Sequence, residues 1–123
     1  MRSHLVRFTV VTTLMILVAA RTAGAQVCVT VDEGRDMLSA DERRAATLLL
    51  TTQFEREGLR VVTANCTGTY VVSHVRLGDT ISVTLIGPAG RREGTALGLN
   101  DLPALYSQLV RSMLTGRAVG SMG

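Results

Sequence analysis

The sequence predicts one small α+β domain, a two-layer sandwich in which two helices pack mainly on one face of a mixed sheet of about five strands. Three observations support this. A strand, a helix and a second strand follow one another through short loops. Three further strands are separated by glycine-containing turns. The chain then closes with a strongly amphipathic helix, which gives the element order β-α-β-β-β-β-α.

Residues 1–25 have the features of a cleaved secretory signal peptide. A basic start is followed by an apolar run at 8–20, which is shorter than the about 20 residues needed to span a bilayer. Small residues at 23–25 match a cleavage site. A signal anchor that is not cleaved, or a buried helix, is the alternative.

Cleavage would leave a single domain at 26–116 and a flexible tail at 117–123. We expect a periplasmic or secreted protein with no membrane insertion after cleavage. A lipid anchor on Cys28 is not expected, because Val27 stands where a lipobox needs a small residue.

The charge balance of the processed chain argues against a nucleic-acid partner. Cleavage removes three of the 13 arginines, and the ten that remain equal the ten Asp and Glu residues. The basic precursor is therefore no evidence for binding nucleic acid. The chain also has no lysine, which excludes a P-loop and a Schiff-base lysine.

The first half of the domain reads as strand, helix and strand. Residues 27–31 are apolar and β-branched, which is typical of a buried strand. Ser39 and Glu42 form a capping box that starts a helix, and Gly58 is its expected stop. Residues 59–64 resemble a second strand. Strands joined through one helix are expected to be parallel, with a right-handed crossover.

The second half reads as three strands and a helix. Residues 69–77, 80–86 and 91–97 predict strands, the last of them short and at an edge. Asn100 or Asp101 would cap the final helix, and the chain carries Pro103 in its first turn and Gly116 as its stop. Its apolar stripe consists of Leu102, Leu105, Tyr106, Leu109, Val110 and Met113.

The alternation in these strands predicts one covered face and one open, polar face. A three-residue turn with Gly78 or Asp79 at positive φ would bring the apolar sets of strands 69–77 and 80–86 onto the same face. The face under the helices would carry Val71, Val75, Leu77, Ile81, Val83, Leu85, Gly94 and Ala96. The open face would carry Tyr70, His74, Arg76, Ser82, Thr84, Arg91, Glu93 and Thr95.

The two cysteines leave two outcomes open. An even number of cysteines in an oxidising compartment favours a disulfide between Cys28 and Cys66. The predicted topology argues against it, because one cysteine opens the first strand and the other follows the end of the second. In a parallel pair these are opposite ends, too far apart for a bridge.

Nothing in the sequence predicts a catalytic, metal or cofactor site. His74 is the only histidine after residue 25, and no Gly-x-Ser-x-Gly elbow is present. Two cysteines and one distant histidine lack the spacing of metal ligands. We therefore expect no enzyme, although a small hydrolase or thiol-redox protein using Cys66 or His74 is the alternative.

The chain after residue 25 resembles, over most of its length, a known group of envelope domains, beginning with the order strand, helix, strand. Its features are YVV at 70–72, a Leu-Gly turn, ISVTL at 81–85, and LNDLPAL at 99–105 opening the last helix. This pattern is similar to the small periplasmic domains of CsgG, LpoB and the TolB amino-terminal domain. The resemblance implies a non-catalytic envelope module that acts through protein contacts.

The sequence thus predicts an exported binding or adaptor domain whose partner is an envelope protein. A free sheet edge could bind by strand addition. A third hypothesis is a structural subunit whose final helix joins another copy through Tyr106 and Met113, and the oligomeric state is left open. The candidate partner-binding face is Tyr70, His74, Arg76, Arg91 and Glu93.

Overall fold

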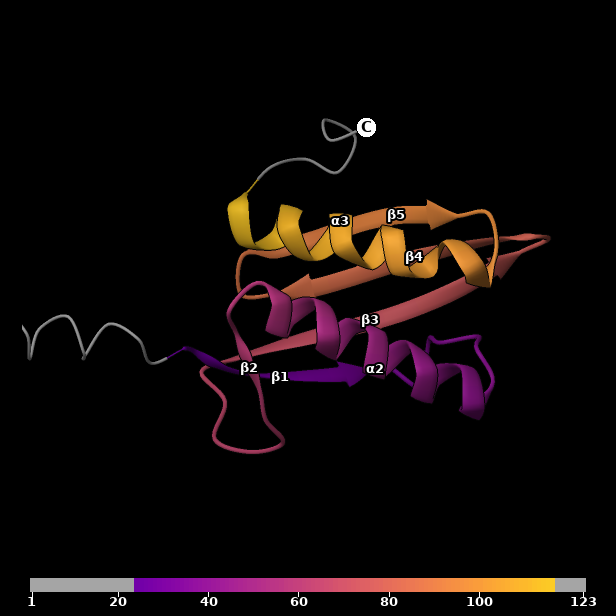
Figure 1. Ribbon diagram of the computed structural model, residues 1–123. Coiled ribbons are helices and arrows are strands. Elements are labelled where there is room, and N and C mark those ends of the chain that lie inside the picture. The colour runs from indigo at the N-terminus through magenta and orange to yellow at the C-terminus, as the bar shows by residue number, and fades with distance from the viewer. Residues whose placement is uncertain (1–23, 117–123) are drawn as a thin grey trace, which may run out of the picture.

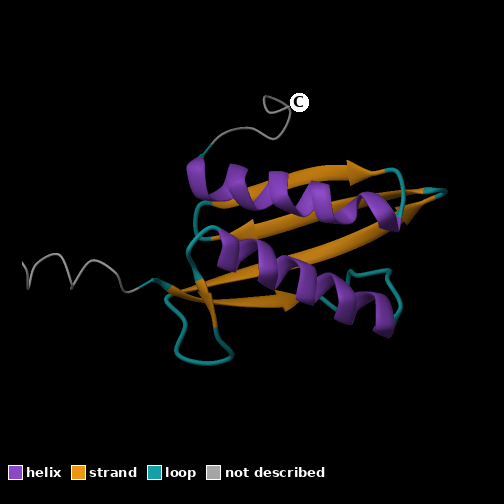
Figure 2. Ribbon diagram, in the orientation of Figure 1, coloured by secondary structure: helices purple, strands orange, loops and turns teal. Residues whose placement is uncertain are grey.

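The computed structural model describes residues 24–116 and confirms the predicted α+β sandwich. Both helices lie on one face of a single sheet, and the other face has no helix over it (Figure 1, Figure 2). Nearly all of the predicted signal peptide (1–25) and the whole predicted tail (117–123) lie outside the described residues.

The sheet is mixed and has the strand order β2-β1-β3-β4-β5. β1 runs parallel to both of its neighbours, whereas β3, β4 and β5 form an antiparallel meander. The predicted parallel pairing of the first two strands and the edge position of the last are therefore confirmed. The strands are β1 (Gln26–Val31), β2 (Arg60–Val61), β3 (Gly68–Leu77), β4 (Thr80–Gly87) and β5 (Gly90–Ala96).

Helix α2 (Ala40–Arg56) begins and ends at the predicted residues. The Ser39 hydroxyl accepts a hydrogen bond from the Glu42 amide at 3.2 Å, and Glu42 accepts one from the Ser39 amide at 2.9 Å. Two backbone donors that the first turn leaves free are thereby satisfied. Gly58 follows the helix at φ +88°, which favours glycine.

Helix α3 (Leu102–Thr115) follows a short 3₁₀ turn, η1 (Leu99–Asp101). Asp101 occupies the capping position, but its side chain makes no capping hydrogen bond. At the other end Gly116 has φ +77°, and its amide donates to the Ser112 carbonyl at 2.9 Å. The predicted stop is therefore confirmed.

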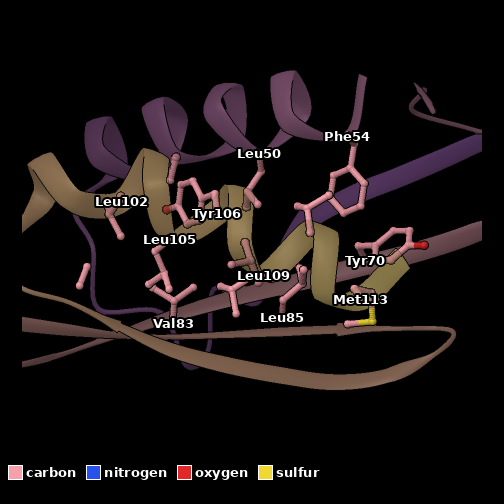
Figure 3. Close-up of a cluster of buried hydrophobic side chains, with 14 of the residues drawn as sticks. Leu50, Phe54, Tyr70, Val83, Leu85, Leu102, Leu105, Tyr106, Leu109 and Met113 are labelled. Atoms are coloured by element: carbon pink, nitrogen blue, oxygen red, sulfur yellow. The ribbon is translucent and has the colours of Figure 1, made fainter. Parts of the chain in front are cut away.

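The core lies between the two helices and the covered face of the sheet (Figure 3). Phe54 of α2 packs on Tyr70 of β3 with ring centroids 4.5 Å apart. Tyr106 and Met113 are both buried within the domain, so the prediction that they contact another copy is wrong. The side chains drawn from both helices and the sheet include Leu50, Val83, Leu85, Leu102, Leu105 and Leu109.

Gly94 lets α3 approach β5 closely. A Cβ at this position would lie 2.5 Å from Cδ1 of Leu105, which is closer than carbon atoms pack.

Replacing Gly94 with alanine is therefore expected to lower the free energy of unfolding by about 1–3 kcal/mol. Urea unfolding of the variant measures this. The same change at partly buried Gly98, where a Cβ meets nothing within 4 Å, is the control. Equal effects of the two changes would contradict the close packing.

The face that β3 presents to the helices differs from the prediction. The β3–β4 turn contains only Gly78 and Asp79, because Leu77 pairs directly with Thr80. Gly78 has the expected positive φ, +63°, at the first central position, as in a type II′ turn. A turn one residue shorter reverses the faces of β3. Tyr70, Val72 and His74 therefore point under the helices, while Val71, Val75 and Leu77 lie on the open face.

Candidate functional site: the open face of the sheet

The open face of the sheet has a mixed aliphatic and polar surface. The register of β3, β4 and β5 places alternate residues of each strand on it, and none of these side chains is buried. Its apolar part includes Val75, Leu77 and Ile86, whose exposed fractions are 36%, 64% and 42%. Ser73, Ser82, Thr84 and Thr95 lie among them. A sheet face with this much exposed aliphatic surface is suited to contact with another protein.

A small polar cluster stands on the same face at the β4–β5 edge. Arg91 and Glu93 form an ion pair, and the Thr84 hydroxyl donates to Oε1 of Glu93 at 3.3 Å. The Arg91 guanidinium lowers the pKa of Glu93, which therefore stays ionised. The predicted placement of Ser82, Thr84, Arg91, Glu93 and Thr95 on the open face is confirmed.

The other three residues of the candidate partner-binding face lie elsewhere. Tyr70 and His74 are buried in the core, so their predicted exposure is wrong. The two-residue turn between β3 and β4 reverses the faces of β3 and places both side chains under the helices. Arg76 shares their side of β3, beyond the core, where its guanidinium pairs with Oε2 of Glu42 at 2.5 Å. This ion pair connects β3 to the first turn of α2. Arg91 and Glu93 remain as predicted contact residues.

His74 is the centre of a buried polar network that sequence reasoning did not find. Its Nδ1 lies 2.6 Å from Oδ1 of Asp36, and its Nε2 lies 2.5 Å from the hydroxyl of Tyr106. A carboxylate can only accept, so Nδ1 carries a proton and donates to Asp36. The neutral ring then accepts from the Tyr106 hydroxyl at Nε2. The network joins β3 to α3 and to the loop before α2.

Asp36 accepts hydrogen bonds from three directions besides the His74 ring. Its Oδ1 accepts the His74 amide at 2.8 Å, and its Oδ2 accepts the Leu38 amide at 3.2 Å and Nε of Arg43 at 2.9 Å. The carboxylate is fully buried, whereas the Arg43 side chain is 30% exposed. The four donors, one of which is the guanidinium of Arg43, explain how this carboxylate is held in the core. The sequence reads 32–37 as a loop and offers no local signal for the role of Asp36.

Burial sets the protonation of this network. It lowers the pKa of His74 despite the nearby Asp36, because desolvation outweighs the attraction. Burial likewise raises the pKa of the Tyr106 hydroxyl, with a further contribution from the charge of Asp36. The ring is thus neutral and its two nitrogens are occupied within the fold, with none of its surface exposed.

The lowered pKa of His74 makes stability depend on pH. As pH falls below about 6.5, the unfolded chain takes up a proton at this residue before the folded chain does. We therefore expect the free energy of unfolding to fall with pH between about 7.5 and 5.5, by at most about 1.4 kcal/mol per pH unit. Urea titrations across this window measure it. A flat profile would contradict a neutral, buried ring.

Cys28 and Cys66 form a disulfide with their Cα atoms 5.6 Å apart. The topological objection fails because β2 is only two residues long, against the 59–64 that were expected. The chain therefore leaves the sheet beside the start of β1, not beside its end. There the Thr67 amide donates to the Gln26 carbonyl at 2.8 Å, which brings Cys66 next to Cys28.

No helix of residues 24–116 is both long and apolar enough to cross a bilayer.

A minor lipoprotein from Acinetobacter baumannii has the same fold. Its crystal structure aligns with a TM-score of 0.52 over 77% of this chain and 94% of the lipoprotein, at 13% sequence identity. A PelC dodecamer from Paraburkholderia phytofirmans aligns over 73% of this chain and 86% of its own, with a TM-score of 0.46 and 14% identity. Neither a family model nor a curated protein matches the sequence. At 13% identity the likeness establishes the fold alone.

Proposed function

We propose that the chain is an exported, non-catalytic module of the bacterial envelope that binds a partner protein through the open face of its sheet. The observation that carries the proposal is the uncovered face itself, on which Ile86 lies beside the Arg91–Glu93 pair and exposed Val75 and Leu77 lie towards the β3–β4 turn. Exposed aliphatic residues bordered by charges are typical of protein contact surfaces.

Two further observations support an envelope location. The fold is shared with a lipoprotein, and the chain contains a disulfide, which persists in oxidising compartments. The resemblance to the small periplasmic domains of CsgG, LpoB and TolB points the same way. Fold similarity does not transfer a partner, so the partner is proposed only as an envelope protein.

The alternative of a hydrolase or thiol-redox protein finds less support in the geometry. His74 has no exposed surface, and both ring nitrogens are hydrogen-bonded within the fold. Cys66 is bonded to Cys28. A hydrolytic or redox reaction would therefore require opening the core or reducing the disulfide.

Crosslinking in cells tests the proposal. The full precursor with a C-terminal tag would be expressed in a diderm bacterium, crosslinked, and captured, and its N-terminus would be sequenced. We expect processing to Gln26 and reproducible capture of one envelope protein. Clean processing with no captured protein would count against an adaptor.

Variants of matched exposure localise the contact. Leu77 on the open face is 64% exposed, and Leu48 on α2 is 68% exposed. We expect Leu77→Glu and Arg91→Ala to reduce capture at least about fivefold, because a few residues dominate most protein interfaces. Leu48→Glu should leave capture unchanged. Equal capture by all three variants would exclude the open face.

A further inference from the structure

The outer edge of β1 is left unpaired along most of its length. β2 pairs with β1 only at Gln26 and Val27, and no other strand of the described residues lies on that side (Figure 2). The Val62 amide donates to the Val27 carbonyl at 2.8 Å, so the polar groups of Val27 point to the outer edge. Because backbone direction alternates along a strand, the N–H and C=O groups of Val29 and Val31 point outward as well.

A groove runs along this open edge. It has a volume of about 430 Å³ and lies between β1 and the first two turns of α2. Val29 and Val31, which are partly buried, line it from the sheet, and Ala40, Arg44 and Thr47 line it from the helix. The groove thus combines an apolar floor with a row of backbone donors and acceptors along its side.

The charge on the helix side of the groove is available to a ligand. Arg44 is 78% exposed, and Nη2 of its guanidinium pairs with Oδ1 of Asp41 at 3.0 Å, in a side chain that is itself 93% exposed. Such an exposed ion pair contributes little and is readily exchanged for another carboxylate. Arg43 stays bound to buried Asp36, and Glu33 stands beyond the end of β1. A carboxylate of a bound segment is therefore favoured beside Arg44, on the helix side of the groove.

We infer that this groove binds an extended segment of a partner protein, which adds to the sheet as a strand beside Val29–Val31. The segment would carry aliphatic residues at alternate positions facing α2, with an acidic residue among them that meets Arg44. Backbone pairing would supply the affinity and the alternate side chains the specificity. This site is separate from the open face, so each can fail without the other.

A synthetic peptide tests the inference directly. The probe is acetyl-Thr-Val-Thr-Asp-Thr-Val-amide, in which the two valines and the aspartate share one face when the peptide is extended. It would be titrated into the exported, processed chain while backbone amide signals are followed by NMR. We expect the Val29 and Val31 amides to shift and to become protected from hydrogen exchange. Unchanged signals at both amides up to the solubility limit of the peptide would overturn the inference.

N-methylation distinguishes strand pairing from adhesion of side chains. Methylating alternate residues of the probe removes the N–H groups on one edge only, and there are two such patterns. Pairing predicts that one pattern weakens binding at least about tenfold and that the other leaves it nearly unchanged. Equal binding by both patterns would overturn the inference.

Charge reversal on the protein provides the second control. We expect Arg44→Glu to weaken binding of the probe at least about fivefold, and a probe with lysine in place of aspartate to bind Arg44→Glu better than the original chain. Arg56 lies on the same helix, is exposed and does not line the groove, so Arg56→Glu should leave binding of the probe unchanged. Equal weakening by both changes would show a general charge effect and overturn the proposed contact.

Discussion

Replacing Asp36 with alanine is expected to lower the free energy of unfolding by about 3–5 kcal/mol. The change leaves the ring and amide of His74 without their acceptor and removes the counter-ion of Arg43. Unsatisfied donors in a core lose their hydration without compensation, which makes this loss larger than that of an exposed pair. Chemical denaturation followed by circular dichroism measures the change.

Asp41 offers the matched control for Asp36. It also pairs with an arginine, Arg44, but the carboxylate is 93% exposed. Asp41→Ala should change the free energy of unfolding by no more than about 0.5 kcal/mol. If the two variants lose similar stability, the buried network is not what holds the loop, β3 and α2 together.

Removing the disulfide is expected to cost about 4 kcal/mol, because it releases a loop of about 38 residues in the unfolded chain. The bridge joins Cys28 in β1 to Cys66, 38 positions later. The double variant Cys28→Ser, Cys66→Ser should unfold at a much lower urea concentration than the oxidised chain. Reduction of the unaltered protein should give the same shift. Identical midpoints with and without reductant would contradict a closed bridge between the two cysteines.

The elements of this fold could be predicted because their signals are local. The capping box at Ser39 and Glu42, the glycine at 58 and the apolar stripe of 102–113 each depend on residues within a few turns of one another. The small residues Gly94 and Ala96 also marked the strand that α3 covers.

The faces of β3 could not be predicted because they depend on one residue in a turn. Both faces of 69–77 carry apolar residues, so the sequence allows either face to be buried. The pairing of Leu77 with Thr80 decides it, and that pairing places His74 in the core and Val75 outside. The predicted placement on the open face is therefore confirmed for Arg91 and Glu93 in β5 and wrong for Tyr70, His74 and Arg76 in β3.

The polar network and the disulfide depend on residues far apart in the chain. Asp36 and His74 are 38 positions apart, as are Cys28 and Cys66, and neither pair follows from local spacing. The disulfide also required the early exit of the chain at Val61. The sequence 59–64 gives no sign of that exit, since its β-branched residues suit a longer strand.

The position of β1 between β2 and β3 has a consequence for the order of folding. Strands β3, β4 and β5 are joined by tight turns and lead directly into α3, so their contacts form between neighbouring parts of the chain. β1 must instead pair with segments that are synthesised later, on both of its sides. Local contacts generally form faster than distant ones. We therefore expect the C-terminal meander to act as a template into which the N-terminal strand inserts last. The sheet would thus stay incomplete until the second half of the chain has been synthesised. The disulfide between the two cysteines would then form and stabilise the completed sheet.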